Sequence, residues 1–266
     1  MKNNLLTICL LLLITSCDSG PSLTKICQLD KELCQVFTED SWCKLERKNV
    51  IIGSSLAKKT QEDIQKFNLL LNLEDYSKCL NHAKKIEHIK LKSKKSLRIE
   101  NFLKSKQLIK EVSEDTKNST HPSLLFYHWS RYTNKEALNS LLLMEGSAAL
   151  DTPEAQFNLA SYYVKRDKYK TLSHLFHALE LYKKDEVINV EIFSSLVTIF
   201  QNSERAKQAY IWLKVLHLYQ PNNENTTEET LIDFAKVNHL KSKFLDKVAY
   251  QTLDNIKSGT FKTPTF

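Results

Sequence analysis

The chain has 266 residues, of which 42% are hydrophobic and 26% are charged, and its formal net charge is +7. Its four glycines and five prolines are too few for the many turns of a sheet-rich fold, and they exclude Gly-rich loops that cradle phosphates. Leucine, lysine, glutamate, alanine and asparagine dominate, which favours helices. We therefore expect an all-α protein.

The N-terminal segment has the pattern of an export signal. Lys2 supplies a positive charge, and residues 5–14 form an apolar run shorter than the ~20 residues that span a bilayer. Two small polar residues then lead directly into Cys17. This arrangement resembles the lipobox of bacterial lipoproteins, which implies removal of residues 1–16 and lipid attachment to Cys17. The alternative is an ordinary secretory signal peptide followed by a chance cysteine.

The residues around Cys17 indicate which membrane would carry the protein. Asp18 resembles the inner-membrane retention signal of enterobacterial lipoproteins, which implies the periplasmic face of the inner membrane, with the outer membrane as the alternative. Several acyl chains, such as palmitate, would make the attachment of Cys17 effectively permanent. Residues 17–22 form a tether that at ~3.3 Å per residue reaches under about 20 Å, so the folded body would sit close to the headgroups.

Four further cysteines remain once Cys9 is removed with the signal and Cys17 is lipidated: Cys27, Cys34, Cys43 and Cys79. An even number in an exported chain predicts two disulfides, with three alternative pairings. If residues 23–37 form one helix, Cys27 and Cys34 lie ~10 Å apart along it, beyond bridging distance. A tight turn at residues 37–41 would place Cys34 opposite Cys43. We therefore favour the pairs Cys34–Cys43 and Cys27–Cys79. The cysteines lack the paired C-x2-C spacing of zinc sites, so we expect no metal.

Helical patterns recur along the chain with short breaks. Thr152 followed by Pro153 is a typical helix start. The predicted helices cover residues 23–37, 42–50, 60–71, 74–89, 93–114, 123–132, 135–148, 153–166, 169–182, 189–202, 204–219, 228–237 and 240–257. A polar break at residues 116–122 separates an N-terminal helical region, 23–117, from a second helical region, 118–257. Residues 258–266 lack the pattern and are expected to form a mobile tail.

Positive charge is concentrated between Lys84 and Lys110, where ten basic residues accompany two acidic ones. Contact with anionic headgroups would contribute ~1 kcal/mol per basic residue near the surface. The alternative is a solvated outer helix face above an apolar stripe. Nucleic acid is not an expected partner, because an exported chain does not meet it. The expected surface-contact residues are Lys90, Lys92, Lys94, Lys95 and Arg98.

The second helical region repeats with a period of 36 residues. This shift aligns Ala160 with Leu196, and Leu143 falls in an equivalent column one step earlier. Each unit would be a helix-turn-helix that must stack on its neighbours to bury its apolar face. Residues 206–213, A-x2-A-Y-x-W-L, resemble the second helix of tetratricopeptide or Sel-one-like repeats, although the glycines of Sel-one-like repeats are absent. The resemblance implies a stacked solenoid; a helical bundle with an accidental period is the alternative.

Besides Cys34, several motifs are spread over most of the chain. They are Trp42-Cys43, Tyr76-x2-Cys79, the run PSLLFYHWSR at residues 122–131, and the segments at 159–167 and 209–212. In these motifs the chain resembles a family of uncharacterised gammaproteobacterial lipoproteins that is known as a domain of unknown function. The resemblance implies no particular activity.

Aromatic and arginine side chains gather on the first helices of two successive repeats, and such residues commonly anchor binding surfaces. Tyr127 and Tyr163 share a repeat column, so we expect them in the core. The residues expected to be exposed and to bind a partner are His128, Arg131, Tyr162 and Arg166.

The sequence offers only weak candidates for a catalytic site. Ser130 stands near His128 but lacks a G-x-S-x-G turn and an orienting carboxylate. His174 and His177 share a helix, but no further residue completes a metal site. We therefore expect a non-enzymatic, lipid-anchored periplasmic protein, without cofactor or metal, that binds or positions another envelope protein. The alternatives are a peptidoglycan-acting hydrolase and a lipid- or glycan-binding envelope module.

Overall fold

The computed structural model describes residues 22–86 and 93–264. The chain divides into two compact units, Met1–Leu124 and Leu125–Phe266, whereas the sequence predicts a boundary after residue 117. The predicted signal peptide, the lipidation site and the sorting residue lie outside the described residues, as do Lys90 and Lys92.

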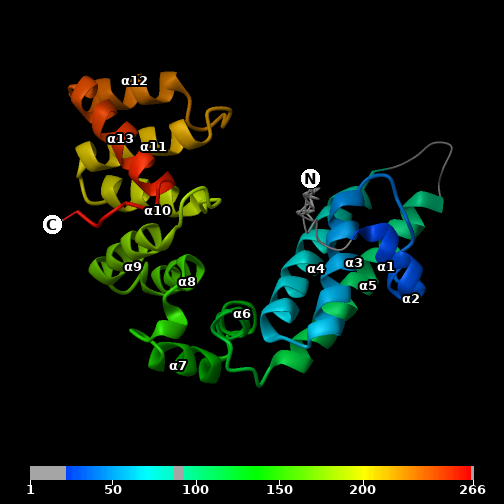
Figure 1. Cartoon of the computed structure of the whole chain (residues 1–266). Coiled ribbons are helices and arrows are strands. Elements are labelled where there is room, and N and C mark those ends of the chain that lie inside the picture. The colour runs from blue at the N-terminus through cyan, green and yellow to red at the C-terminus, as the bar shows by residue number, and fades with distance from the viewer. Residues whose placement is uncertain (1–21, 87–92, 265–266) are drawn as a thin grey trace, which may run out of the picture. The chain divides into compact units, whose positions relative to one another are not determined.

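The first unit is built around three long helices with two short helices at its N-terminal end (Figure 1). Helix α4, Asp63–Ala83, packs against both α3, Lys44–Thr60, and α5, Ser93–Thr116. Helices α1, Leu23–Leu29, and α2, Lys31–Gln35, contact each other and α3. The inward faces of α3 and α4 supply most of the apolar core, including Val50, Ile51, Leu70, Leu73, Tyr76 and Leu80.

Several helix boundaries differ from the sequence prediction; for example, the helix predicted over residues 42–50 continues to Thr60 as α3. Residues 23–37 form two helices, because the backbone leaves the helical region at Asp30, where φ is −136°. The carboxylate of Asp30 accepts a hydrogen bond of 3.2 Å from the Leu33 backbone N–H and so caps α2. Conversely, the predicted helices 60–71 and 74–89 form the single helix α4, since neither glycine nor proline interrupts it.

The disulfides join Cys27 to Cys34 and Cys43 to Cys79. The prediction that these four cysteines form two disulfides is confirmed, but the predicted pairs Cys34–Cys43 and Cys27–Cys79 are wrong. The error follows from the break at Asp30: α2 turns away from α1, and the Cα atoms of Cys27 and Cys34 lie 5.6 Å apart. Cys43 lies at the start of α3, with its Cα atom 6.0 Å from that of Cys79 on α4.

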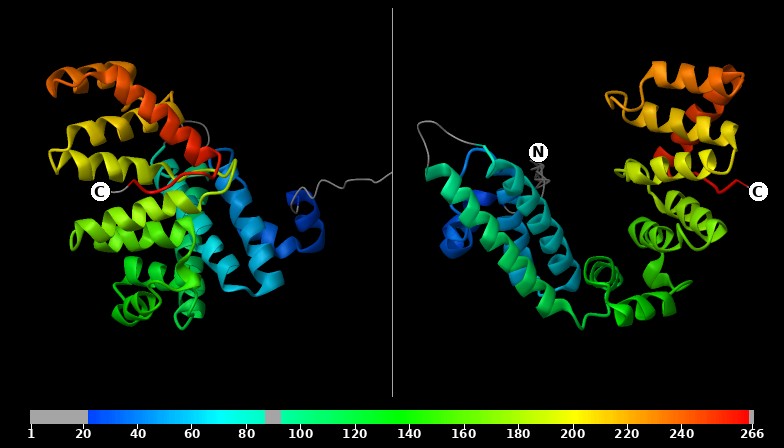
Figure 2. Two further views of the ribbon diagram at one scale, coloured as in Figure 1. Left: turned by 60° about the vertical axis from the view of Figure 1, so that its left-hand side comes forward. Right: turned by 180° about the vertical axis from the view of Figure 1, so that it is seen from behind.

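Helical hairpins form the second unit. Helix α8, Pro153–Tyr163, pairs with α9, Lys168–Leu181, and α10, Val190–Gln201, pairs with α11, Ala206–Tyr219. These hairpins stack, with α9 contacting α10 and α11 contacting the following helices (Figure 2). The other helices from Pro122 onward are, in chain order, α6, Pro122–Tyr132, α7, Lys135–Leu143, the 3₁₀ helix Ala148–Leu150, α12, Glu228–Val237, and α13, Ser242–Lys257.

The hairpins α8–α9 and α10–α11 follow each other at a step of 37 residues between the starts of their first helices, Pro153 and Val190, which is close to the predicted period of 36. Ala160 and Leu196, which the period aligns, are both buried, as are Leu179 and Val215. One step earlier the pattern holds in part: Leu124 and Tyr127 are buried, whereas Leu143, which ends α7, is 88% exposed. A continuous apolar core runs from Ala160 to Phe261.

The C-terminal segment is ordered in the structure as far as it is described, whereas the sequence predicts a mobile tail over residues 258–266. Phe261 is buried, and its ring lies 6.4 Å from those of Phe176 and Trp212. The backbone N–H of Thr263 donates a hydrogen bond of 2.6 Å to Glu180. Burial of one aromatic ring therefore fixes a segment that has no helical pattern.

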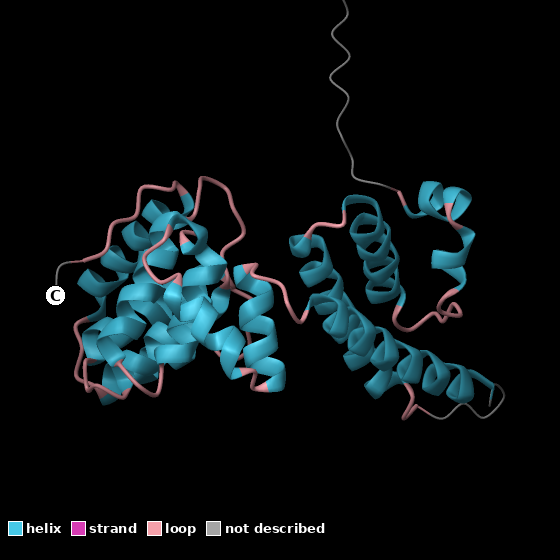
Figure 3. Ribbon diagram, turned by 90° about the horizontal axis from the view of Figure 1, so that it is seen from below, coloured by secondary structure: helices cyan, strands magenta, loops and turns pink. Residues whose placement is uncertain are grey.

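In both units the described residues form helices and connecting loops without a strand (Figure 3). The expectation of an all-α fold with a disulfide-bonded N-terminal region is confirmed. Within this part of the chain, no helix combines the length and the apolar character that crossing a membrane requires.

Candidate functional site

The four residues that the sequence predicts for partner binding differ in how exposed they are. Arg131 and Arg166 are exposed and Tyr162 is half-buried, but His128 is only 4% exposed. The prediction of an exposed His128 is therefore wrong. On α6, His128 lies one helical turn after the buried Leu124, so it belongs to the inward face of the helix.

Trp129, one position further along α6, lies on the face that meets α8. Its ring centroid is 5.3 Å from that of Tyr162, with the two planes inclined by 72°. Phe126 extends the contact, 5.5 Å from Trp129. The guanidinium of Arg166 lies 4.3 Å from the centre of the Tyr162 ring and donates a hydrogen bond of 2.6 Å to the Tyr162 carbonyl oxygen. We call Trp129, Tyr162 and Arg166 the aromatic surface.

Sequence reasoning missed Trp129. Its position three residues after Phe126 places both rings on one side of α6, while Leu124 and His128 share the inward side. Trp129 also lies one helical turn after the buried Leu125, so the signal for it in the sequence is the i, i+3 spacing of two aromatic residues rather than the burial pattern of α6. Tyr127 is buried as expected, but Tyr163 is half-buried rather than part of the core.

A polar network holds Tyr163 beside the aromatic surface. The Tyr163 hydroxyl donates to Glu145 at 2.5 Å, and the ammonium of Lys170 lies 2.9 Å from Glu145 and 3.0 Å from the Tyr163 hydroxyl. The ring of His174 stacks on that of Tyr163 at 5.5 Å, and its Nδ1 lies 2.8 Å from the Gln156 carboxamide. The Tyr162 and Tyr163 rings are 4.8 Å apart, so the network also constrains the aromatic surface.

The charges of this network compensate one another at neutral pH. Burial alone would raise the pKa of Glu145, but hydrogen bonds from Tyr163 and Lys170 outweigh it and lower that pKa. Burial raises the pKa of Tyr163, and the hydrogen bond to Glu145 raises it further. The hydrogen bonds with Tyr163 and Glu145 raise the pKa of Lys170, and burial lowers that of His174. The network therefore contains a carboxylate, an ammonium and two neutral rings, an arrangement suited to fixing a surface.

Ser130 stands two residues after His128 on α6 and is exposed, whereas His128 is buried. The Ser130 hydroxyl donates to the Tyr127 carbonyl oxygen at 3.3 Å. His177 lies 2.7 Å from Asp151 and 3.4 Å from Glu180, whereas His174 faces Gln156 and Glu145. The two histidines thus have different partners.

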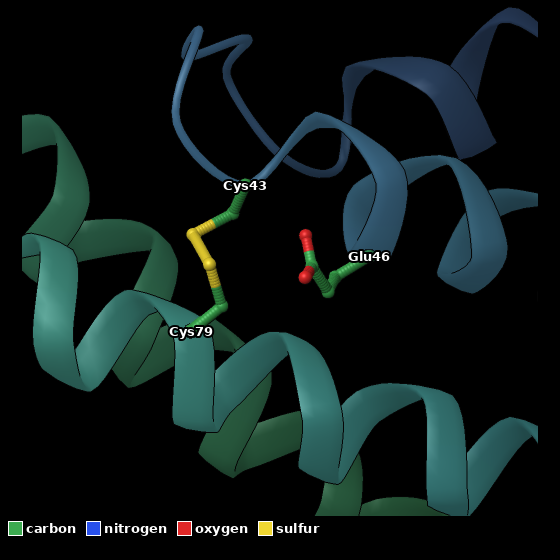
Figure 4. A group of neighbouring side chains, drawn as sticks. All are labelled: Cys43, Glu46 and Cys79. Carbon is green, nitrogen blue, oxygen red and sulfur yellow. A yellow bond between two sulfur atoms is a disulfide. The ribbon is translucent and has the colours of Figure 1, made fainter. Parts of the chain in front are cut away.

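The first unit contains a group with metal-ligand proximity: Cys43, Glu46 and Cys79, whose ligand atoms lie within 4.8 Å of one another. Figure 4 shows that the two sulfur atoms form the disulfide, with the Glu46 carboxylate directed toward the space between α3 and α4. A disulfide leaves no thiolate for a metal. The donor set therefore does not fit a zinc ion in the oxidised protein.

Arg98 was expected to contact an anionic surface, and that prediction is wrong. Its side chain is 1% exposed, since Arg98, Asn101 and Ser105 form the inward face of α5. The guanidinium binds Asp40 at 2.5 and 3.2 Å and donates to the Ala83 carbonyl oxygen at 3.0 Å. Burial alone would raise the pKa of Asp40, but the hydrogen bond and charge of Arg98 outweigh it and hold that pKa below its ordinary value.

Lys94 and Lys95, which were expected to contact the same anionic surface, are half-buried. Both lie in the first turn of α5, next to residues 87–92, which the structure does not describe. A contact of these two lysines with anionic headgroups therefore stays a prediction.

A family model described as "Protein of unknown function (DUF2989)" matches residues 14–214 of the chain. No curated protein and no solved structure matches it. The matched range includes the disulfides of the first unit and the aromatic surface of the second.

Proposed function

We propose a function for this chain, which belongs to the DUF2989 family of proteins of unknown function: it is a lipid-anchored, non-enzymatic protein of the bacterial periplasm that binds another envelope protein. The hairpins of the second unit act as a tetratricopeptide-like array, and the aromatic surface is the binding site. The observation that carries the proposal is the contact between Trp129 and Tyr162, with Arg166 over the tyrosine ring.

The location rests on two independent features. The first is the apolar run ending in Cys17, which fits lipidation and cleavage, with Asp18 favouring the inner membrane. The second is the pair of disulfides in the first unit, because disulfides persist in oxidising compartments such as the periplasm. A short tether after Cys17 would hold the folded units near the membrane.

The nature of the partner follows from the chemistry of the surface. Tryptophan, tyrosine and arginine are the residues that most often dominate protein–protein binding energy. Here they come from α6, from α8 and from the turn that follows α8, and the Glu145 network fixes the neighbouring tyrosine. A surface held in place before binding loses less side-chain entropy on association, which favours affinity. Arg131, exposed on α6, has its guanidinium 5.6 Å from the centre of the Tyr127 ring.

Cross-linking of the full-length protein in intact cells, followed by mass spectrometry, tests this proposal. We expect one dominant protein partner that is lost in a Trp129→Ala/Arg166→Ala variant. The matched control is Tyr169→Ala, which removes an aromatic ring that is 78% exposed on α9, outside the aromatic surface. The proposal would be refuted if the unchanged protein, the double variant and Tyr169→Ala captured the partner equally, or if no specific protein were captured.

A second measurement tests the anchor. Intact mass analysis of the purified protein should show a chain that begins at Cys17 and carries acyl groups, and Cys17→Ala should abolish both. A mature chain that begins elsewhere would refute lipid anchoring while leaving the aromatic surface to be tested separately.

A further inference from the structure

A groove between α3 and α4 carries chemistry that the proposed function does not use. One part, with a volume of about 450 Å³, is lined by Trp42, Glu46, Asn49, Asn72 and Asp75, among others. The adjoining part, of about 480 Å³, shares Asn49, Asn72 and Asp75 with the first and continues along the two helices. Sites that bind small organic molecules commonly measure roughly 300–1,000 Å³.

Gly53, which lines the groove on α3, lies directly opposite Asn72. A Cβ atom at this position would lie 2.9 Å from the Asn72 carboxamide nitrogen, so glycine allows that carboxamide to lie across α3. Asn72 also donates to the Asn49 carbonyl oxygen at 3.4 Å. The floor of the groove is therefore a carboxamide held by two helices.

Aromatic, carboxamide, charged and aliphatic side chains line the groove, the last being Leu45, Ile52, Leu56 and Leu71. Trp42 is 57% exposed and provides a flat apolar surface at one end. Asn49, Gln65, Asn68 and Asn72 provide carboxamides, each with two N–H donors and a carbonyl acceptor. An aromatic face beside groups that both donate and accept hydrogen bonds matches a pyranose ring, which has an apolar C–H face and hydroxyls at its edge.

The charges of the groove disfavour strongly charged ligands. Two carboxylates, Glu46 and Asp75, line it together with the ammonium of Lys78 and the imidazole of His82. An anion would face the carboxylates, and a cation would face Lys78. A neutral polar ligand avoids both costs of burying an unpaired charge.

The tryptophan is held in position from two directions. Cys43, its neighbour in the chain, is bonded to Cys79, which itself lines the groove on α4. The buried Arg98 guanidinium lies 5.8 Å from the centre of the Trp42 ring, within cation–π range of about 6 Å. The platform is therefore positioned before any ligand binds, which reduces the entropic cost of binding.

We propose that the α3–α4 groove binds a short, uncharged oligosaccharide, with one pyranose stacked on Trp42 and its neighbours hydrogen-bonded by the carboxamides of Asn49, Asn68 and Asn72. This site lies within the first unit and does not depend on the protein partner proposed for the second unit.

Calorimetric titration of the oxidised full-length protein, in a detergent that contains no sugar, tests the proposal. The probes are a tetramer of N-acetylglucosamine and a tetramer of glucose, so that an N-acetylated glycan can be distinguished from a plain one. We expect at least one tetramer to bind with a Kd of about 1 mM or lower, so that binding approaches saturation at about 10 mM sugar. No binding of either tetramer would overturn the proposal.

Variants then locate the binding. Trp42→Ala should weaken it about tenfold, the loss expected for an aromatic stacking contact. Asn68→Ala, an exposed position, should weaken it severalfold, whereas Tyr169→Ala, which removes an exposed ring in the second unit, should bind like the unchanged protein. Trp42→Tyr retains an aromatic face and should restore most of the affinity, which separates stacking from misfolding. Unchanged binding in both Trp42→Ala and Asn68→Ala would place the sugar elsewhere and overturn the proposal.

Discussion

The two units of the molecule achieve a fixed fold by different means. In the second unit, apolar side chains from successive hairpins form a continuous core from Ala160 to Phe261. In the first unit, the segment between α2 and α3 is held largely by directional polar contacts. Arg98 binds Asp40, Asn101 exchanges two hydrogen bonds with the Thr38 backbone, and Arg47 donates to the carbonyl oxygens of Phe37 and Cys34. The irregular backbone of this segment therefore depends on specific hydrogen bonds and a disulfide in addition to the burial of Phe37, whereas the repeated helices depend on burial.

The largest expected effect of a single substitution is at the buried ion pair. Arg98→Met leaves the Asp40 carboxylate buried without its partner, and loss of one member of such a pair costs about 3–5 kcal/mol. We expect hydrogen exchange of α4 to accelerate while that of α10 is unchanged. The double variant Arg98→Met/Asp40→Leu removes the unpaired charge and should recover most of the loss. Equal acceleration in both units would contradict this separation.

The two disulfides should contribute unequally to the first unit. They close loops with sequence separations of 36 and 7, and the chain-entropy model gives about 4 and about 2.4 kcal/mol, respectively. Urea unfolding of Cys43→Ser/Cys79→Ser and of Cys27→Ser/Cys34→Ser measures the difference. If the shorter loop proved the more stabilising, local strain or packing rather than loop closure would determine the stability.

Within the second unit, the buried ring of the C-terminal segment should matter although it lies outside any helix. Phe261→Ala removes contacts with Phe176 and Trp212 and should cost about 3 kcal/mol. Thermal unfolding followed by tryptophan fluorescence provides the measurement. The control is Phe244→Ala on α13, where the ring is 70% exposed and little change is expected. Similar losses in both variants would show that the segment is not part of the core.

The smallest effect is a pH dependence confined to the first unit's ion pair. The folded-state pKa of Asp40 lies below its ordinary value of 3.8. Its contribution to stability is therefore fully present above about pH 4 and is lost as the pH falls through the folded-state pKa. The stability difference between the unchanged protein and Asp40→Asn should shrink on acidification below about pH 4. A difference that stayed constant would mean that Asp40 does not titrate in this range.

Sequence reasoning was most successful where the determining interactions are local. The start of α8 follows from Thr152, which accepts a hydrogen bond of 3.2 Å from the Ala155 backbone N–H, and from Pro153 at the first helical position. The hairpins of the second unit follow from a period that a helix-turn-helix unit requires. These features need only the identities of neighbouring residues.

The errors arise where distant residues determine the outcome. Asp40 and Arg98 are 58 positions apart, so a run of basic residues gave no indication that one of them is buried beside a carboxylate. The disulfide pairing depends on the change of direction at Asp30, which a single long helix conceals. In the aromatic surface, the i, i+3 spacing of two aromatic residues could have identified Trp129, but its contact with Tyr162 on α8 required the packing of two helices.

The connectivity of the disulfides also bears on how the chain is oxidised. The four cysteines of the first unit pair in the order in which they occur in the chain, Cys27 with Cys34 and then Cys43 with Cys79. A chain that meets an oxidant N-terminus first can close each bond as soon as the second cysteine of the pair arrives. An oxidase alone then suffices for maturation, without an isomerase to exchange wrongly paired sulfurs.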